Sequence, residues 1–130
     1  LILVRDCLFH LSFDDIDKFL INIKETNYKY LLTTTHLVEP GFQNKDIITG
    51  DFRIINLFNY PFNFKKSSVS SRVLDCASNS RVKKEMILLE KKNVPTCLSI
   101  TWTDINRSYW HKLIINYIIF IVLLVNEQIR

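Results

Sequence analysis

Residues 1–35 read LILVRDCLFHLSFDDIDKFLINIKETNYKYLLTTT. An apolar run at residues 1–4 is followed by a helical pattern and then by a second run, residues 28–35. This second run is rich in aromatic and β-branched side chains, which favour strands. The connection between the two runs is long enough for a crossover helix, which joins parallel strands. The sequence therefore predicts a strand–helix–strand unit and the α/β fold class.

The stretch between the two runs contains the start, the body and the end of a helix. Ser12 offers an N-cap oxygen, and Asp15 resembles its capping-box partner with a shorter acid. Thr26-Asn27 ends the pattern. Apolar residues recur between them with the spacing of one helix face: Ile16, Phe19, Leu20 and Ile23. We therefore expect an amphipathic helix that lies on a sheet.

The first apolar run begins at residue 1 without a lead-in. Because a parallel strand is buried on both faces and needs neighbours, we expect residues 1–4 to lie in the middle of a larger sheet. Residues 51–58 predict one further strand or an irregular extended segment. Residues 60–64 predict an edge or loop piece, since Pro61 interrupts them. The chain is thus interpreted as part of an α/β protein.

Composition argues against several kinds of site. The two glycines, Gly41 and Gly50, are too few for a GxGxxG fingerprint and too far apart for a P-loop. The three cysteines are scattered, which favours a reducing compartment over a disulfide framework. Neither they nor the histidines have metal-ligand spacing, so no metal is expected. The lysine pairs of the second half are also scattered, which predicts a solvated surface and makes nucleic acid an unexpected partner.

Charge divides the chain into two parts. Residues 1–64 have six Lys/Arg and eight Asp/Glu, whereas residues 65–130 have eleven and five. We expect an α/β part at 1–64 and a basic, poorly ordered segment containing Ser and Lys at 65–107. A hydrophobic helix is expected at 108–130, in a tail that looks unrelated to the first part. Within the second half, two weaker patterns indicate a short helix and a strand: residues 81–92 and 97–103.

Leu113–Val125 is an apolar stretch interrupted only by Asn116 and Tyr117. Aromatic and basic residues precede it, as at a membrane interface, but a spanning helix needs about 20 apolar residues. Three interpretations stay open: a membrane-inserted helix, a buried helix or strand, and a disordered or mistranslated segment. The first makes the chain a non-enzymatic membrane-attached protein. Without insertion the expected location is the cytoplasm.

Several short motifs arrive in one order and resemble the C-terminal half of a class I S-adenosylmethionine-dependent methyltransferase. The resemblance covers residues 1–64 and implies a partial Rossmann-like sheet, consisting of strand–helix–strand plus one further strand. It makes the run at residues 1–4 the fourth strand of that sheet and the run at residues 28–35 the fifth. The motifs are VRDCLFHLS at 4–12, KYLLTTT at 29–35, NKDI at 44–47, TGDFR at 49–53, NL at 56–57 and PFNF at 61–64.

The resemblance also implies where ligands bind. It puts Arg5, Asp6 and Cys7 at the carboxyl end of a strand, where open α/β sheets bind ligands, and makes them the cofactor-binding residues for S-adenosyl-L-methionine. It implies that five further residues lie on the substrate side: His10, Thr34, Thr35, Arg53 and Asn56. A purely structural role stays open for most of the cofactor-side and substrate-side residues. Arg5 can simply end a strand, for example, and strand propensity alone can explain the threonines. No catalytic residue is assigned.

The sequence departs from the family pattern in ways that bear on activity. Phe52 stands where the family has Trp, and Ile54 stands where it has Pro. After Phe64 the remaining strands of the family are not recognisable. The glycine-rich turn and the acid that bind the cofactor are absent from these residues, and methyl transfer depends on positioning. We therefore expect the chain alone to be inactive, and no feature identifies the methyl acceptor.

Overall fold

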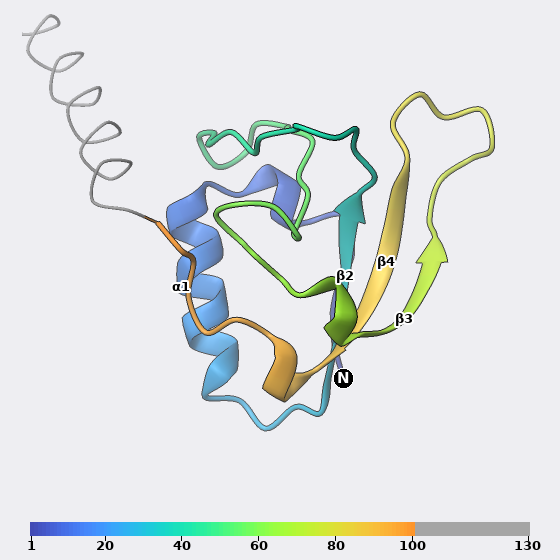
Figure 1. Cartoon of the computed structure of the whole chain (residues 1–130). Helices are drawn as coiled ribbons and strands as arrows, with labels where there is room; N and C mark the ends of the chain where they lie inside the picture. Colours follow the sequence, from blue (N-terminus) through green and yellow to red (C-terminus); the bar gives the residue numbers. More distant parts are fainter. Residues whose placement is uncertain (101–130) are drawn as a thin grey trace, which may run out of the picture. The chain divides into compact units, whose positions relative to one another are not determined.

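The computed structural model describes residues 1–100, of which residues 1–99 form one compact unit (Figure 1). The expected hydrophobic helix at 108–130, with Leu113–Val125, lies outside the described residues. Among residues 1–100, no helix is long and apolar enough to cross a membrane. In chain order the elements are β1 (Ile2–Val4), η1 (Leu8–His10), α1 (Phe13–Lys24), β2 (Tyr30–His36), η2 (Lys66–Ser68), β3 (Val69–Leu74), β4 (Lys84–Glu90) and η3 (Lys91–Asn93).

The predicted strand–helix–strand unit is confirmed. β1 and β2 are parallel, with Val4 opposite Thr33, and α1 lies between them in the chain. Ser12 is the N-cap of α1, and its Oγ accepts a hydrogen bond from the Asp15 N–H at 3.2 Å. The predicted apolar stripe faces the interior, with Phe19 half-buried and the other three residues buried: Ile16, Leu20 and Ile23.

The sheet has four strands in the order β1-β2-β4-β3, and β4 is antiparallel to both of its neighbours. Two expectations for the second half of the chain are therefore wrong. The short helix expected within 81–92 is the strand β4, because Ile87 and Leu89 alternate toward the core and pair with β2. The segment 65–107 is not poorly ordered over its described part, because β3 and β4 form a hairpin there.

Residues 51–58 form the irregular extended segment rather than the further strand. They run beside the end of β2, where the His36 N–H donates to the Ile55 carbonyl at 2.8 Å. The Leu57 N–H donates to Thr35 Oγ1 at 3.0 Å. A threonine side chain thus takes the place of the main-chain carbonyl that would accept this hydrogen bond in a regular strand pair. The further strands of the sheet are β3 and β4.

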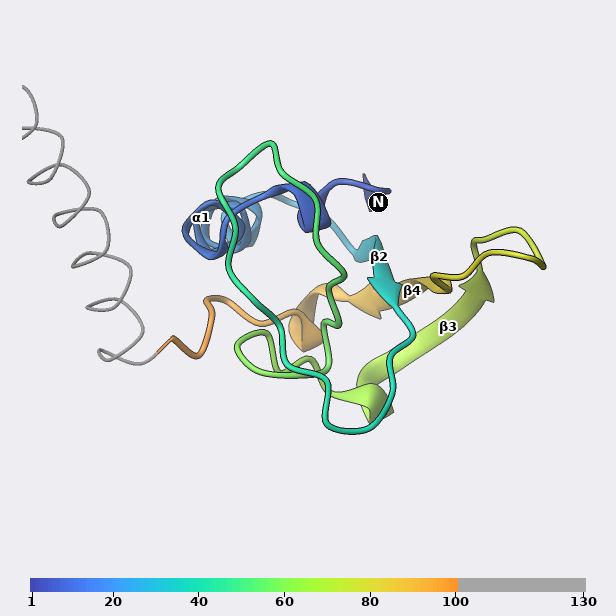
Figure 2. The same ribbon diagram turned by 90° about the horizontal axis from the view of Figure 1, so that it is seen from above.

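One face of the sheet is covered, and the other is open over part of its area, around Leu3, Leu32, Val73 and Leu88. α1 and residues 53–64 lie on the same side of the sheet (Figures 1 and 2). The strand residues on this side are buried: Leu31, Thr33, Thr35, Ile87 and Leu89. On the opposite side, within residues 1–100, Leu3 is 60% exposed, Val73 is 62% exposed, and Leu32 and Leu88 are half-buried.

Truncation of two neighbouring leucines tests the assignment of β4. Leu89→Ala is expected to lower the free energy of unfolding by roughly 2–5 kcal/mol, because Leu89 is fully buried on the covered face. Leu88→Ala is expected to cost less than half as much, since Leu88 is half-buried on the open face. Urea unfolding followed by far-UV circular dichroism measures both. Equal losses would contradict the alternation of a strand.

Candidate functional site

Several segments meet at one end of the sheet. The carboxyl ends of β1 and β2, the helix η1, the loop of residues 37–53 and the β3–β4 connection all lie there (Figure 1). Open α/β sheets bind ligands at the carboxyl ends of their parallel strands. The predicted cofactor-side residues Arg5 and Asp6 follow directly after β1, so they are part of this end.

Asp6 has an unusual backbone conformation with φ +53°. Asp enters this left-handed region more readily than most residues because its short polar side chain bonds locally. Two contacts hold it there. Its N–H donates to Thr34 Oγ1 at 3.0 Å, and its carboxylate accepts a hydrogen bond from Lys84 Nζ at 2.5 Å. A residue held in a strained conformation is a recurring feature of ligand sites.

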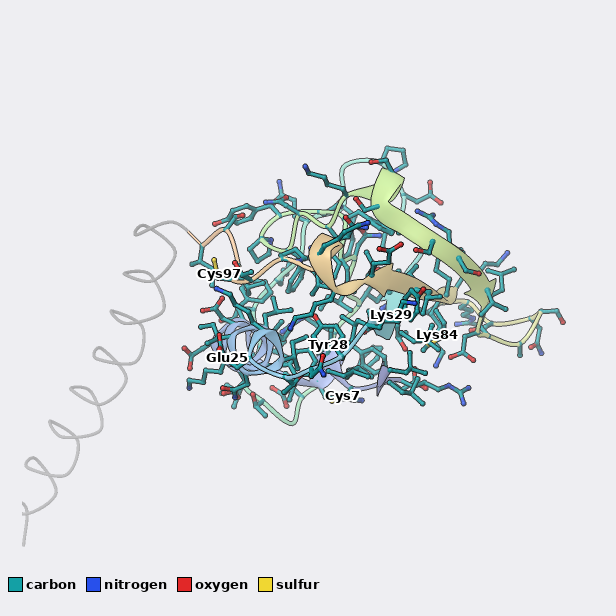
Figure 3. All side chains as sticks on the ribbon, turned by 90° about the horizontal axis from the view of Figure 1, so that it is seen from below. Cys7, Glu25, Tyr28, Lys29, Lys84 and Cys97 are labelled. Atoms are coloured by element: carbon teal, nitrogen blue, oxygen red, sulfur yellow. The ribbon has the colours of Figure 1, made fainter. Side chains whose placement is uncertain are left out.

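Four charged side chains form an alternating network across this end of the sheet. Arg5 donates two hydrogen bonds to Asp75, at 3.0 and 2.7 Å. Lys84, labelled in Figure 3, lies between Asp75 at 3.8 Å and Asp6. The hydrogen bonds and charge of Arg5 hold the pKa of Asp75 below its usual range. The network links β1 to the β3–β4 connection, although β1 and β4 are not neighbours in the sheet.

The predicted threonines lie on opposite faces of β2 and do different things. Thr34 is buried beside Asp6, and its Oγ1 lies 3.1 Å from Met86 Sδ. Thr35 accepts the Leu57 N–H and thereby holds the segment after residue 53. Asn56 acts with Thr35, because its Nδ2 donates to the His36 carbonyl at 2.8 Å. The structure thus brings Thr34 to Asp6, while Thr35 and Asn56 hold the main chain in place.

Cys7 and His10 lie on the segment between β1 and α1. Cys7 is an exposed free thiol, well separated from Cys97 (Figure 3). His10 Nδ1 lies 2.8 Å from the Asp51 carbonyl, so Nδ1–H donates to it. The His10 ring also packs against Phe9 and Phe52, with centroid distances of 4.7 and 5.8 Å. Since Phe52 is 58% exposed, these rings form an aromatic wall at the carboxyl end of the sheet.

Arg53 is the predicted residue with the most unusual surroundings. Its side chain is only 6% exposed, yet its three guanidinium nitrogens make no hydrogen bond within residues 1–100. Asp46 Oδ1 is 3.8 Å from Nη1, and the guanidinium carbon lies 4.8 Å from the Phe13 ring centre. Burial lowers the pKa of Arg53 to about 10, so the group stays charged at neutral pH.

The structure adds residues that the sequence interpretation missed. Lys84 and Asp75 complete the charged network, and Asp46 stands next to Arg53. His36 is buried at the end of β2, where the Ile55 N–H donates to its Nδ1 at 3.1 Å. The lysine and the aspartates gave no local signal, because charged residues in loops and at strand ends are usually solvated.

The described residues at this end form no group that would bind a metal ion. Within residues 1–100 no group of three His, Cys, Asp or Glu side chains could hold a metal ion. A shallow hollow of about 540 Å³ lies at the opposite end, near Tyr28 and Lys29 (Figure 3). The charged side chains that line it already have partners, such as Lys92 with Glu90 at 2.9 Å and Lys91 with the Thr26 carbonyl at 2.8 Å. Comparison with protein-family models, curated proteins and solved structures gives no match.

The buried His36 predicts a loss of stability in mild acid. Burial lowers its pKa below the value of about 6.5 for an unfolded histidine. Between pH 7.5 and 5.5 the unfolded chain therefore binds more protons than the folded chain, and the free energy of unfolding falls as the pH falls. Urea midpoints at the two pH values measure this decrease.

His36→Phe keeps an aromatic ring but removes the acceptor of the Ile55 N–H, so we expect the variant to be less stable. Because phenylalanine cannot titrate, the variant should also lose most of the pH dependence. His10→Phe is the matched control, because both histidine rings pack against Phe9 and Phe52, whereas His10 is half-exposed. The decrease between pH 7.5 and 5.5 should be smaller in His36→Phe than in His10→Phe. A His36→Phe variant with an undiminished decrease between pH 7.5 and 5.5 would show that other groups cause it.

Proposed function

We propose that residues 1–99 are the carboxyl-terminal part of a class I S-adenosyl-L-methionine-dependent methyltransferase domain. In this proposal β1 and β2 are the fourth and fifth strands, and β3 and β4 are the two strands that close the sheet. The residues contribute one side of the methyl-transfer site. They do not catalyse methyl transfer by themselves.

The order of the strands is the observation that carries the proposal. The chain passes through β3 before β4, yet β4 lies between β2 and β3 and runs antiparallel to both. Many doubly wound sheets, the class to which the methyltransferase sheet belongs, add an antiparallel strand towards one edge of an otherwise parallel sheet. The motifs of residues 1–64 and the order of the strands after them thus support the same family.

The open parts of the sheet also support the proposal. Doubly wound sheets have helices on both faces, whereas α1 and residues 53–64 are on one side only (Figure 2). Within residues 1–100, β1 pairs with β2 alone. An apolar side chain, Leu3, is exposed on β1. A larger methyltransferase sheet would cover this edge and this face.

The residues at the carboxyl end fit the cofactor only in part. The Asp6 carboxylate is 40% exposed and could accept hydrogen bonds from a bound ligand, but it is already paired with Lys84. The two glycines, Gly41 and Gly50, both lie in the loop after β2, and neither follows a strand into a helix. These residues therefore offer a contact for S-adenosyl-L-methionine but no main-chain cradle for it.

Isothermal titration of the full 130-residue chain with S-adenosyl-L-methionine tests the proposed lack of independent activity. We expect no binding at micromolar affinity, because the glycine-rich turn is not among these residues. S-adenosylhomocysteine, which lacks the transferable methyl group, should behave in the same way. Micromolar binding of either compound would contradict this part of the proposal.

The gene provides the direct test of the family. The proposal expects an in-frame segment before the codon for Leu1 that encodes a glycine-rich turn. In the extended protein, Asp6→Asn should weaken S-adenosyl-L-methionine binding roughly tenfold, as expected for a lost hydrogen bond to a charged group. Asp51→Asn, a matched change in an exposed loop, should leave the affinity unchanged. An in-frame stop codon with no such segment would overturn the proposal.

A further inference from the structure

Arg53 is a buried cation with unused hydrogen-bonding capacity. A guanidinium has five N–H donors, and none of the three nitrogens of Arg53 has a hydrogen-bond partner within residues 1–100. Its side chain is 94% buried, since only 6% of it is exposed. A buried charge without a hydrogen-bonded partner is costly. The hydrogen-bonding capacity of the Arg53 guanidinium is therefore unused within residues 1–100.

The guanidinium is held at the amino-terminal end of α1. It stacks over the ring of Phe13, the first residue of that helix, and this ring packs edge-on against Phe62 at 5.5 Å. The main chain is fixed as well, because the Arg53 N–H donates to the Phe9 carbonyl at 3.1 Å. The stacking on Phe13 and the fixed main chain thus keep the guanidinium in one place.

Asp46 occupies the position that an anion would take. Its Oδ1 accepts hydrogen bonds from the Phe13 N–H at 2.7 Å and from the Ile47 N–H at 2.9 Å, and lies 3.8 Å from Arg53 Nη1. A helix amino terminus and a guanidinium are both recurring anion ligands. These two hydrogen bonds and the main chain of Asp46 keep its carboxylate too far from Arg53 for a hydrogen bond, whose usual length is about 2.9 Å.

The two members of this pair differ in exposure. The Asp46 side chain is 44% exposed and belongs to the loop after β2, whereas the Arg53 side chain is almost fully buried. Asp46 is thus the member that a solvent-borne anion can replace. A free carboxylate has no tether to the loop, so it can approach the guanidinium and form the paired hydrogen bonds that Asp46 does not make.

We propose that Arg53 and the amino terminus of α1 form a carboxylate-binding site, which Asp46 fills in the unliganded chain. The site takes the carboxylate group of an acidic methyl acceptor. The role of the ligand as an acceptor rests on the proposed methyltransferase function, whereas carboxylate binding does not. The acidic acceptor is a substrate class that no motif in the sequence indicates.

Rescue by acetate tests the site in the full 130-residue chain. Asp46→Ala removes the internal carboxylate, so this variant should unfold at a lower temperature than the unchanged chain. Sodium acetate, compared with sodium chloride at equal ionic strength and neutral pH, should raise its unfolding midpoint by roughly 5 °C when the site is saturated. The unchanged chain should respond much less, because Asp46 competes with acetate.

Two variants control this experiment. In Asp46→Ala/Arg53→Gln the specific effect of acetate should disappear. Asp51→Ala removes an exposed carboxylate from the same loop and should respond to acetate as the unchanged chain does. If acetate shifts the midpoint of the double variant as much as that of Asp46→Ala, or fails to shift Asp46→Ala, the proposal is overturned.

A titration of the unchanged chain covers the case in which Asp46→Ala does not fold. In ¹H–¹⁵N spectra, acetate should move the Arg53 Nε–H and Phe13 N–H signals along a saturable curve, and absence of movement at both would overturn the site. Acetate binding without cofactor binding in the extended protein would leave the site intact and remove the acceptor role. Cofactor binding without acetate binding would leave the methyltransferase proposal and remove the acidic acceptor.

Discussion

Between β2 and β4 runs an antiparallel ladder of seven residue pairs, from Tyr30 opposite Glu90 to His36 opposite Lys84. The rest of the structure depends on it, because β1 pairs only with β2 and β3 pairs only with β4. The ladder joins these two pairs of strands and completes the buried layer in which Leu31 faces Leu89. It also brings Lys84 to the carboxyl end of β1, where the lysine reaches Asp6.

The charged residues at the carboxyl end of the sheet occur in two different environments. Arg5, Asp75, Lys84 and Asp6 alternate in sign in a partly exposed network, and solvent screens such pairs, so each adds little to stability. The network mainly orients Asp6 and fixes the β3–β4 connection. Arg53, in contrast, is buried, and the 3.8 Å between its Nη1 and Asp46 Oδ1 is too long for a hydrogen bond. The burial of Arg53 costs more free energy than the exposed network does, so Arg53 is the better indication of where a ligand binds.

The elements that could be predicted from the sequence are those with local signals. The Ser12 cap and the apolar spacing from Ile16 to Ile23 identify α1, and the β-branched run identifies β2. The apolar run of β4 is too short to distinguish a strand from a helix, and its pairing partners are far away in the chain. The charged network could not be predicted for the same reason, because Lys84 and Asp6 are 78 residues apart in the sequence. The burial of Arg53 follows from the loop that folds over α1, which has no counterpart in local residue preferences.

The unpaired edge of β1 has a consequence for the behaviour of the chain in concentrated solution. Leu1 and Leu3 are 74% and 60% exposed beside a strand whose outer main-chain groups have no ladder partner within residues 1–100. Such an edge is a template on which a strand from another molecule can add. The first charged residue after it, Arg5, is already engaged with Asp75. Self-association through residues 1–100 therefore depends on how well that short edge is shielded.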